Sequence, residues 1–146
     1  MDSAQFEIGL AEDHASIQRC FAVMAELRPH LTEASFLARA LRQQEQAGYQ
    51  LAFLAQGGTV RSLAGFRITE FLAWGRTLYV DDLVTRSDSQ GQKFGSRLFD
   101  WIIDRARDAR CEQVHLDSGV QRHGAHRFYL HKKMDITAHH FAYKIV

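Results

Sequence analysis

The sequence predicts an α/β protein in which a central mixed β-sheet is flanked by about four helices. Helical and strand-like spacings of apolar residues follow one another in the order β α α β β β α β α β. The early strands succeed one another as hairpins, whereas a helix separates two later strands, as in a parallel crossover. The chain has 146 residues without a repeat or a linker. We therefore expect residues 1–146 to form a single domain.

The first elements are one strand and two helices. Phe6–Leu10 is typical of a short strand. Apolar residues at helical spacing predict one helix over His14–Leu27, which Pro29 ends. Thr32 is a suitable N-cap for a second helix, which runs to Gly48.

A glycine pair joins the next two strands. Tyr49–Ala55 and Val60–Glu70 flank Gly57-Gly58, which suits a tight hairpin turn. Side chains two residues apart point to the same side of a strand. We expect the even-numbered apolar residues of the second strand to share one face: Val60, Ala64, Phe66 and Ile68.

Strands and helices alternate in the second half of the chain. A turn near Trp74-Gly75-Arg76 precedes an apolar strand, Leu78–Thr85, and a polar loop, Arg86–Lys93. The helix that follows has an apolar stripe from Phe94 to about Arg110. The remaining expected elements are a strand at Gln113–Asp117, a helix at about Gly124–Lys133 and a final strand at Ile136–Val146.

Composition excludes several classes of function. The formal net charge of +1 gives no field that would steer the chain to nucleic acid. No apolar run reaches the ~18–20 residues of a membrane span, and the N-terminus lacks the features of a signal peptide. We therefore expect a cytoplasmic protein without a nucleic-acid or membrane partner. Cys20 and Cys111 form no CxxC motif and are expected to be small buried side chains.

The loop before the predicted helix at Phe94 has the features of a phosphate site. Unpaired N–H groups and the positive end of the dipole lie at a helix N-terminus. A glycine-containing loop before it lets backbone amides surround a phosphate. Gln90–Ser96 supplies this pattern, and Lys93 and Arg97 add positive charge. An ordinary strand-to-helix turn is the alternative. The P-loop motif GxxxxGK[ST] and an early GxGxxG are both absent.

Two blocks of the sequence resemble the GNAT acetyltransferases. The first runs from Tyr79 to Leu98 and resembles their acetyl-CoA segment, with the pyrophosphate motif Q/R-x-x-G-x-G/A. Gln90 and Gly95 match its first and last positions, whereas Lys93 stands in place of the middle glycine. The second block, Ala125–Leu130, resembles the late helix A-x-x-F-Y of the family.

The resemblance implies a GNAT-type fold, acetyl-CoA as the cofactor and a set of residues that bind it. Backbone groups of one strand would bond the pantetheine arm, and the loop and helix start would bind the diphosphate. The implied cofactor-binding residues are Leu83, Val84, Thr85, Gln90, Gly91, Gln92, Lys93, Phe94, Gly95, Ser96, Arg97 and Phe128.

Direct acetylation of an amine also requires acid and base groups. The resemblance implies Tyr129 as the acid that protonates the leaving thiolate, and Asp81 as the base that removes a proton from the amine. Asp82 is the alternative base, because successive strand residues face opposite sides unless a bulge intervenes. Glu26 and Glu70 are further carboxylates that could line the substrate side, and each acidic residue could instead have a structural role.

The substrate remains open between several classes. Gln121–Leu130 also resembles the matching stretch of aminoalkylphosphonate N-acetyltransferases, which favours a small primary amine as the acceptor. The alternatives are a protein or peptide amine, or a module that binds acyl-CoA without turnover. A homodimer is implied by analogy with the family. His123, His126 and His131 cluster without completing a known ligand motif, so no metal site is expected.

Overall fold

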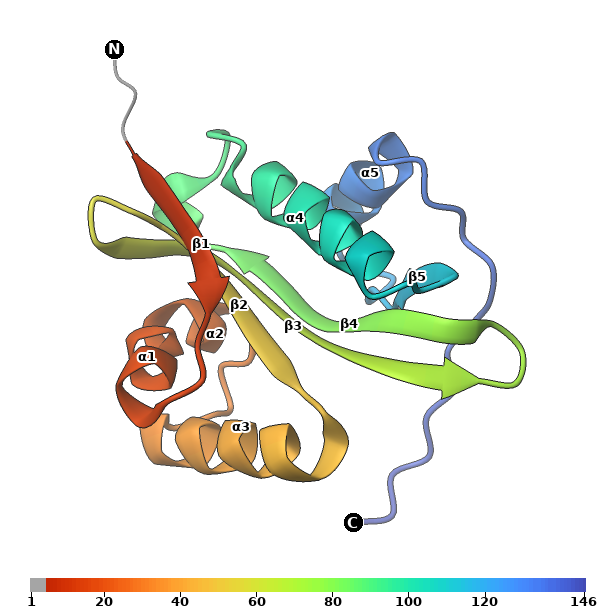
Figure 1. Ribbon diagram of the computed structural model, residues 1–146, viewed down its shortest axis with the longest axis horizontal. Helices are drawn as coiled ribbons and strands as arrows, with labels where there is room; N and C mark the ends of the chain where they lie inside the picture. Colours follow the sequence, from red (N-terminus) through yellow and green to blue (C-terminus); the bar gives the residue numbers. More distant parts are fainter. Residues whose placement is uncertain (1–4) are drawn as a thin grey trace. The chain divides into compact units, whose positions relative to one another are not determined.

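Five strands form one mixed sheet in the order β1-β2-β3-β4-β5 (Figure 1). The computed structural model describes residues 5–146. The strands are β1 (Phe6–Leu10), β2 (Gln50–Gln56), β3 (Thr59–Phe71), β4 (Gly75–Thr85) and β5 (Gln113–Leu116). Strands β1 to β4 pair antiparallel with their neighbours. The chain divides into two compact units, the first ending at His115 and the second spanning Leu116–Val146.

Helices of the first unit lie on both faces of the sheet (Figure 1). Three of them, α1 (His14–Arg19), α2 (Phe21–Leu27) and α3 (Glu33–Ala47), lie on one face, and α4 (Phe94–Asp108) lies on the other. A short 3-10 turn, η1 (Ser87–Ser89), separates β4 from α4. The second unit contains α5 (His123–His131). Apart from a third helix before β2, the predicted order of elements is therefore confirmed as far as α5.

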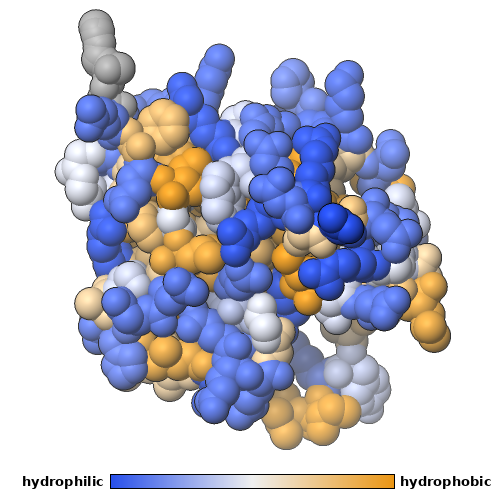
Figure 2. Space-filling view, viewed as in Figure 1, coloured by the Kyte–Doolittle hydropathy of each residue, from blue (hydrophilic) through white to orange (hydrophobic). Residues whose placement is uncertain are grey.

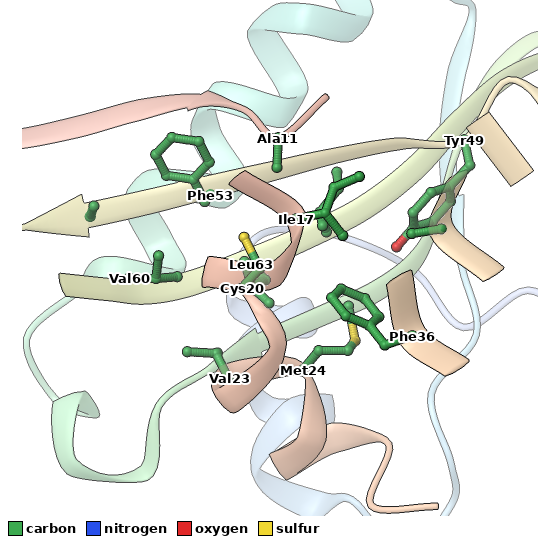
Figure 3. Packing of buried hydrophobic residues seen from close by; sticks show 13 residues of the cluster. Ala11, Ile17, Cys20, Val23, Met24, Phe36, Tyr49, Phe53, Val60 and Leu63 are labelled. Carbon is green, nitrogen blue, oxygen red and sulfur yellow. The ribbon is translucent and has the colours of Figure 1, made fainter. Parts of the chain in front are cut away.

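The main hydrophobic cluster lies between α1–α3 and the sheet. Ile17, Met24 and Phe36 from the helices meet Leu51 and Leu63 from β2 and β3. Figure 3 shows Tyr49 at one end of this cluster, beyond Ile17 and Phe36. The outer surface over α3 is mostly hydrophilic in Figure 2, as an amphipathic helix on a sheet requires.

The predicted helix over His14–Leu27 is wrong in one respect, because it breaks at Cys20. The Cys20 N–H donates to the carbonyl of Ile17 rather than to that of Ser16. The Cys20 thiol donates to the Ser16 carbonyl instead, at 3.3 Å. A side chain that replaces the backbone donor of the i−4 carbonyl bends a helix. The result is two short helices, α1 and α2, where the apolar spacing indicated one.

The predicted helix ends and hairpin turn are confirmed. The Thr32 side chain accepts from the N–H of Ser35 at 3.0 Å, and Ser35 Oγ accepts from the N–H of Thr32 at 2.9 Å. This reciprocal capping box begins α3, which ends before Gly48. Gly57 and Gly58 have φ angles of 60° and 77°. Two left-handed residues in a two-residue loop match the twist of the flanking strands.

The prediction of one shared face for Val60, Ala64, Phe66 and Ile68 is wrong. Ala55 pairs with Val60 and Leu54 pairs with Ser62, so Arg61 is an extra residue in β3. This bulge shifts the alternation by one position. Val60 and Leu63 therefore both join the cluster under α1–α3.

The predicted final strand at Ile136–Val146 does not form. Residues 134–146 have neither helix nor strand. Phe141 and Tyr143 are 92% and 89% exposed. The alternation of apolar side chains is a local signal, whereas a strand also needs a neighbour that accepts its backbone hydrogen bonds.

Candidate functional site

A second bulge, in β4, brings two carboxylates to the same side of the sheet. Gly65 pairs with Asp82, and Phe66 pairs with Val80, so Asp81 is the extra residue. Without the bulge, Asp81 and Asp82 would point to opposite faces. With it, both side chains meet arginines that lie on the α1–α3 side of the sheet.

The first carboxylate, that of Asp81, is held by Arg67 of β3. Arg67 Nε donates to Asp81 Oδ1 at 3.2 Å, and Arg67 Nη2 donates to Asp81 Oδ2. The same Nη2 also donates to Gln43 Oε1 of α3, at 2.9 Å. Burial raises the pKa of the Asp81 carboxyl above its ordinary value, the charge of Asp82 adds to this effect, and Arg67 opposes it. Asp81 is therefore a half-buried carboxylate with an increased affinity for a proton.

The second carboxylate, that of Asp82, has different partners. Tyr49 donates its hydroxyl to Asp82 Oδ2 at 2.9 Å, and Arg28 Nε donates to Asp82 Oδ1 at 3.0 Å. Arg28 also donates to the backbone carbonyl of Asp81, at 2.9 Å. Burial and the neighbouring Asp82 raise the pKa of Tyr49 well above 10, so its hydroxyl remains a donor. Both oxygens of Asp82 are thus occupied by donors.

The end of β4 has a backbone edge that β5 does not cover. The N–H of Glu112 donates to the carbonyl of Arg76 at 2.7 Å, so β5 starts beside the start of β4. Because β5 has four residues and β4 has eleven, β5 ends before it reaches Leu83–Thr85. An added strand, or an extended ligand arm, could bond to this edge.

The three residues expected at this edge of β4 do not all direct their backbone N–H and C=O groups towards it. The N–H of Arg86 donates to the carbonyl of Arg61 in β3, at 2.8 Å. Alternate residues of an antiparallel strand bond to the same neighbour, so Val84 also faces β3. The backbone groups of Leu83 and Thr85 point to the opposite edge. Leu83 and Thr85 are therefore the better placed of the three predicted residues to bind a ligand through the backbone.

The loop after β4 has the geometry that the motif predicts. Gly91 has a φ of 82°, and Lys93 is left-handed, with φ 68° and ψ 16°. Lys93 therefore adopts the conformation for which glycine is preferred, and the turn is preserved. Its side chain is exposed.

Among the described residues, no side chain caps the start of α4. Lys93 is the N-cap residue and makes no side-chain hydrogen bond to the helix. The N–H groups of Phe94, Gly95 and Ser96 have no partner within a helix at these positions. A Cβ on Gly95 would lie 2.9 Å from Thr85 Oγ1, so glycine there permits close packing of α4 on β4.

The neighbouring side chains hold the loop in place. Glu26 Oε1 accepts from the N–H of Ser87 at 2.9 Å, so this carboxylate supports the loop. Arg61 Nη1 donates to the buried Ser89 Oγ at 3.2 Å. Arg97 lies over the ring of Phe6, 4.6 Å from its centroid, and remains exposed. Gln90 and Gln92 are also exposed.

The predicted acid, Tyr129, belongs to the second unit. It lies on α5, its side chain is 9% exposed, and its ring meets that of Phe128 edge to face with centroids 5.5 Å apart. Burial raises the pKa of Tyr129 above 10, although Arg122 nearby opposes the shift. The phenol therefore stays protonated at neutral pH.

Two histidines of the second unit have a hydrogen-bond or ion-pair partner. His126 Nε2 lies 2.8 Å from the carbonyl of Gly119, and His140 Nδ1 lies 3.3 Å from Asp117 Oδ2. Within residues 5–146, no three His, Cys, Asp or Glu side chains are grouped as metal ligands would be. Across the same residues, no helix has the length and apolarity needed to cross a bilayer.

Burial raises the pKa of the Cys20 thiol to about 12, which makes it unreactive.

Known proteins resemble this chain over most of its length. Residues 12–134 match the model of the acetyltransferase (GNAT) family. The chain belongs to the GNAT family. A GNAT relative is the uncharacterized N-acetyltransferase YhdJ of Bacillus subtilis, 32% identical over 85% of this chain and 87% of that protein. The aminoalkylphosphonate N-acetyltransferase of Salmonella typhimurium is 41% identical over a shorter stretch, 35% of this chain and 33% of that protein.

Solved structures confirm the GNAT fold. The aminoglycoside N-acetyltransferase AAC(6′)-Iy, in complex with CoA, superposes with a TM-score of 0.84, over 98% of this chain and 96% of that one, at 10% identity. Glucosamine-6-phosphate N-acetyltransferase of Arabidopsis thaliana gives 0.77, over 97% and 99%, at 16% identity. Acetyl-CoA is the cofactor of this GNAT protein, as the resemblance to the family implies. The uncapped start of α4 and the free edge of β4 fit its diphosphate and its arm.

The sequence did not reveal three members of the carboxylate cluster in this GNAT protein. Tyr49, Arg28 and Arg67 come from different elements, separated from Asp81 and Asp82 by 14 to 54 positions. No local pattern marks such contacts. The one available signal was the pair of adjacent aspartates in an otherwise apolar strand. Two carboxylates that are both half-buried require nearby cations.

Proposed function

We propose that this protein is an acetyl-CoA-dependent N-acetyltransferase that acetylates the primary amine of a small molecule by direct attack. The observation that carries the proposal is the arrangement of β4. Asp81 lies two residues before Leu83, the first residue of the free backbone edge. At about 3.3 Å per strand residue, the two backbone positions are roughly 7 Å apart. A proton acceptor and a binding edge for the cofactor arm therefore lie on one strand.

Asp81 would act as the base. A free alkyl amine has a pKa near ~10.4 and is protonated at neutral pH, so it must lose a proton before it can attack a carbonyl. Asp81 takes this proton, directly or through water, and releases it to solvent. Its raised pKa brings it closer to the pH at which a general base is most effective. Arg67 fixes both carboxylate oxygens and so orients the carboxylate.

The other groups would bind and activate the acetyl donor. When bound, acetyl-CoA supplies the acetyl thioester whose C–S bond breaks as the N–C bond forms. The N–H groups of Phe94, Gly95 and Ser96 hold the diphosphate, and Gln90, Gly91, Gln92, Lys93 and Arg97 surround it. A backbone N–H at Leu83 or Thr85 polarises the thioester carbonyl. Tyr129 carries a proton for the departing sulfur, an assignment that rests on the A-x-x-F-Y motif, as does contact of Phe128 with the cofactor.

The names of the relatives support a small acceptor. Three of those quoted above are named as enzymes for aminoalkylphosphonates, aminoglycosides and an amino sugar phosphate, all of which are small amines. We also propose a cytoplasmic location, which the two free cysteines favour, and a homodimer. Light scattering of the purified chain would measure the oligomeric state, and a monomer at working concentration would exclude the dimer.

A panel of acceptors tests the proposed function. The purified chain is incubated with acetyl-CoA and, separately, with aminoalkylphosphonates, amino sugar phosphates, aminoglycosides, diamines and a lysine-containing peptide, and released thiol is measured. We expect turnover with at least one small amine and loss of turnover in Asp81→Asn. Turnover with the peptide alone would assign a protein substrate. Binding of acetyl-CoA without turnover of any amine would contradict an enzymatic role.

A further inference from the structure

Asp82 is held by two hydrogen bonds that the proposed reaction does not by itself require. Its side chain is only 14% exposed, and it is bonded to Arg28 on one oxygen and to the Tyr49 hydroxyl on the other. A carboxylate that accepts from a guanidinium and from a phenol is fixed in position by charge-assisted hydrogen bonds. Tyr49 belongs to the hydrophobic cluster, and the guanidinium carbon of Arg67 lies 5.6 Å from the centroid of its ring. The structure thus fixes a negative charge at one position beside Asp81.

Gly65 makes room for this contact. A Cβ at position 65 would lie 2.0 Å from the Tyr49 hydroxyl oxygen and 2.6 Å from Asp82 Oδ2. Any side chain there would displace the hydroxyl or the carboxylate. Gly65 is also the partner of Asp82 in the ladder between β3 and β4. The absence of a side chain at this one position therefore lets Tyr49, which directly precedes β2, reach across β3 to Asp82 of β4.

The bulge turns this fixed charge towards Asp81. The two carboxylates are adjacent in the sequence and lie on the same side of the sheet. The groups that face them are Arg67 and Gln43 around Asp81, and Arg28 and Tyr49 around Asp82. The positive charges of the two arginines offset the negative charges of the two aspartates. A second negative charge nearby disfavours ionisation of its neighbour, and the effect is larger where water is partly excluded.

We propose that Tyr49 and Asp82 are positioning residues that strengthen Asp81 as the proton acceptor, with Asp82 acting as a fixed negative charge that Tyr49 and Arg28 hold in place. This inference rests on the proposed function, because it assigns a role relative to the base of that reaction. The proton itself moves from the amine to an oxygen of Asp81 and then to solvent. Asp82 gains no proton in the cycle.

The pH dependence of the reaction tests this role. The variant is Asp82→Asn, and the readout is kcat/KM for the best amine of the panel as a function of pH. Removal of the negative charge lowers the pKa of Asp81, so the acidic limb of the profile moves to lower pH, by about 0.5–1 unit. The plateau falls as well, because Asp81 becomes a weaker base. The exposed Asp108→Asn is the matched control and should leave the limb in place.

A second variant removes only the hydroxyl. Tyr49→Phe should lower kcat about 3- to 10-fold, the effect of one hydrogen bond to a charged group, and leave the KM for acetyl-CoA unchanged. The exposed Tyr143→Phe is its control. A purely structural tyrosine would lower the melting temperature without changing kcat, and that result would overturn the proposal. Binding of acetyl-CoA, measured by calorimetry, verifies that each variant is folded.

Two other outcomes separate this inference from the proposed function. If Asp82→Asn binds acetyl-CoA but is inactive at every pH, Asp82 is itself the acceptor and the tuning role is wrong. If its acidic limb stays in place while Asp81→Asn is inactive, the tuning role fails and the proposed function stands. If the wild-type chain turns over no amine, the proposed function is wrong. If Asp81→Asn is fully active, the assignment of Asp81 as the base is wrong.

Discussion

Lys93 offers a test in which stability and cofactor binding respond in opposite directions. Its φ of 68° places a residue with a Cβ in the left-handed region, which costs about 1–2 kcal/mol. Lys93→Gly removes this cost and adds about 0.4–1 kcal/mol of chain entropy in the unfolded state. We therefore expect a net gain in unfolding free energy of about 0.5–1 kcal/mol. Lys93→Ala removes the same charge but keeps the strain, so it should show no such gain.

The assay is urea unfolding of the three proteins without cofactor, followed by titration with CoA. Lys93→Gly should unfold at a higher urea concentration than Lys93→Ala. If the ammonium contacts the phosphates, both variants should bind CoA about 3-fold more weakly at low salt, and the difference should shrink as salt rises. A Lys93→Gly variant less stable than Lys93→Ala would refute the left-handed geometry. Equal CoA affinity in all three proteins would remove Lys93 from the cofactor site.

Three further predictions concern single residues. Asp81→Asn should lower kcat/KM for the amine about 10²- to 10⁴-fold, the usual effect of a general base, with unchanged calorimetric affinity for acetyl-CoA; a loss below 2-fold would exclude Asp81 as the base. Gly65→Ala should cost about 1–3 kcal/mol in urea unfolding, because its Cβ would lie 2.0 Å from the Tyr49 hydroxyl oxygen; an unchanged midpoint would show that this contact is absent. Asp13 caps α1 and has a lowered pKa, so its stabilising effect exists above the ordinary pKa of aspartate and disappears as pH falls through the lowered value. The stability difference between wild type and Asp13→Ala should accordingly shrink in acid, and a constant difference would contradict it.

Local signals in the sequence predicted much of the fold. The Thr32 cap and the Gly57-Gly58 turn depend on residues within a few positions of one another, and both are confirmed. The break at Cys20 was missed because it depends on which donor reaches the Ser16 carbonyl, which apolar spacing does not encode. The strand expected at the C-terminus was wrong because strand formation requires a partner that the segment itself cannot specify.

Part of the candidate site could also be predicted from a local signal in the sequence. The loop motif located the uncapped start of α4, although Lys93 departs from the motif, because its backbone still adopts the glycine-like conformation. The bulge at Asp81 was not predictable from alternation, since one inserted residue reverses the side on which every later side chain lies. Alternation alone therefore could not predict that Asp81 and Asp82 lie on the same side of the sheet, bonded to Arg67 and Tyr49 respectively.

The central claim is that the free edge of β4 and the start of α4 together bind the cofactor. Titration of isotope-labelled protein with CoA, followed through backbone amide resonances, measures this directly. We expect the largest shifts at Leu83, Thr85 and Gly95, and a smaller shift at Val84, whose N–H faces β3. Shifts confined to other parts of the chain, with these amides unchanged at saturation, would contradict the assignment of the cofactor site.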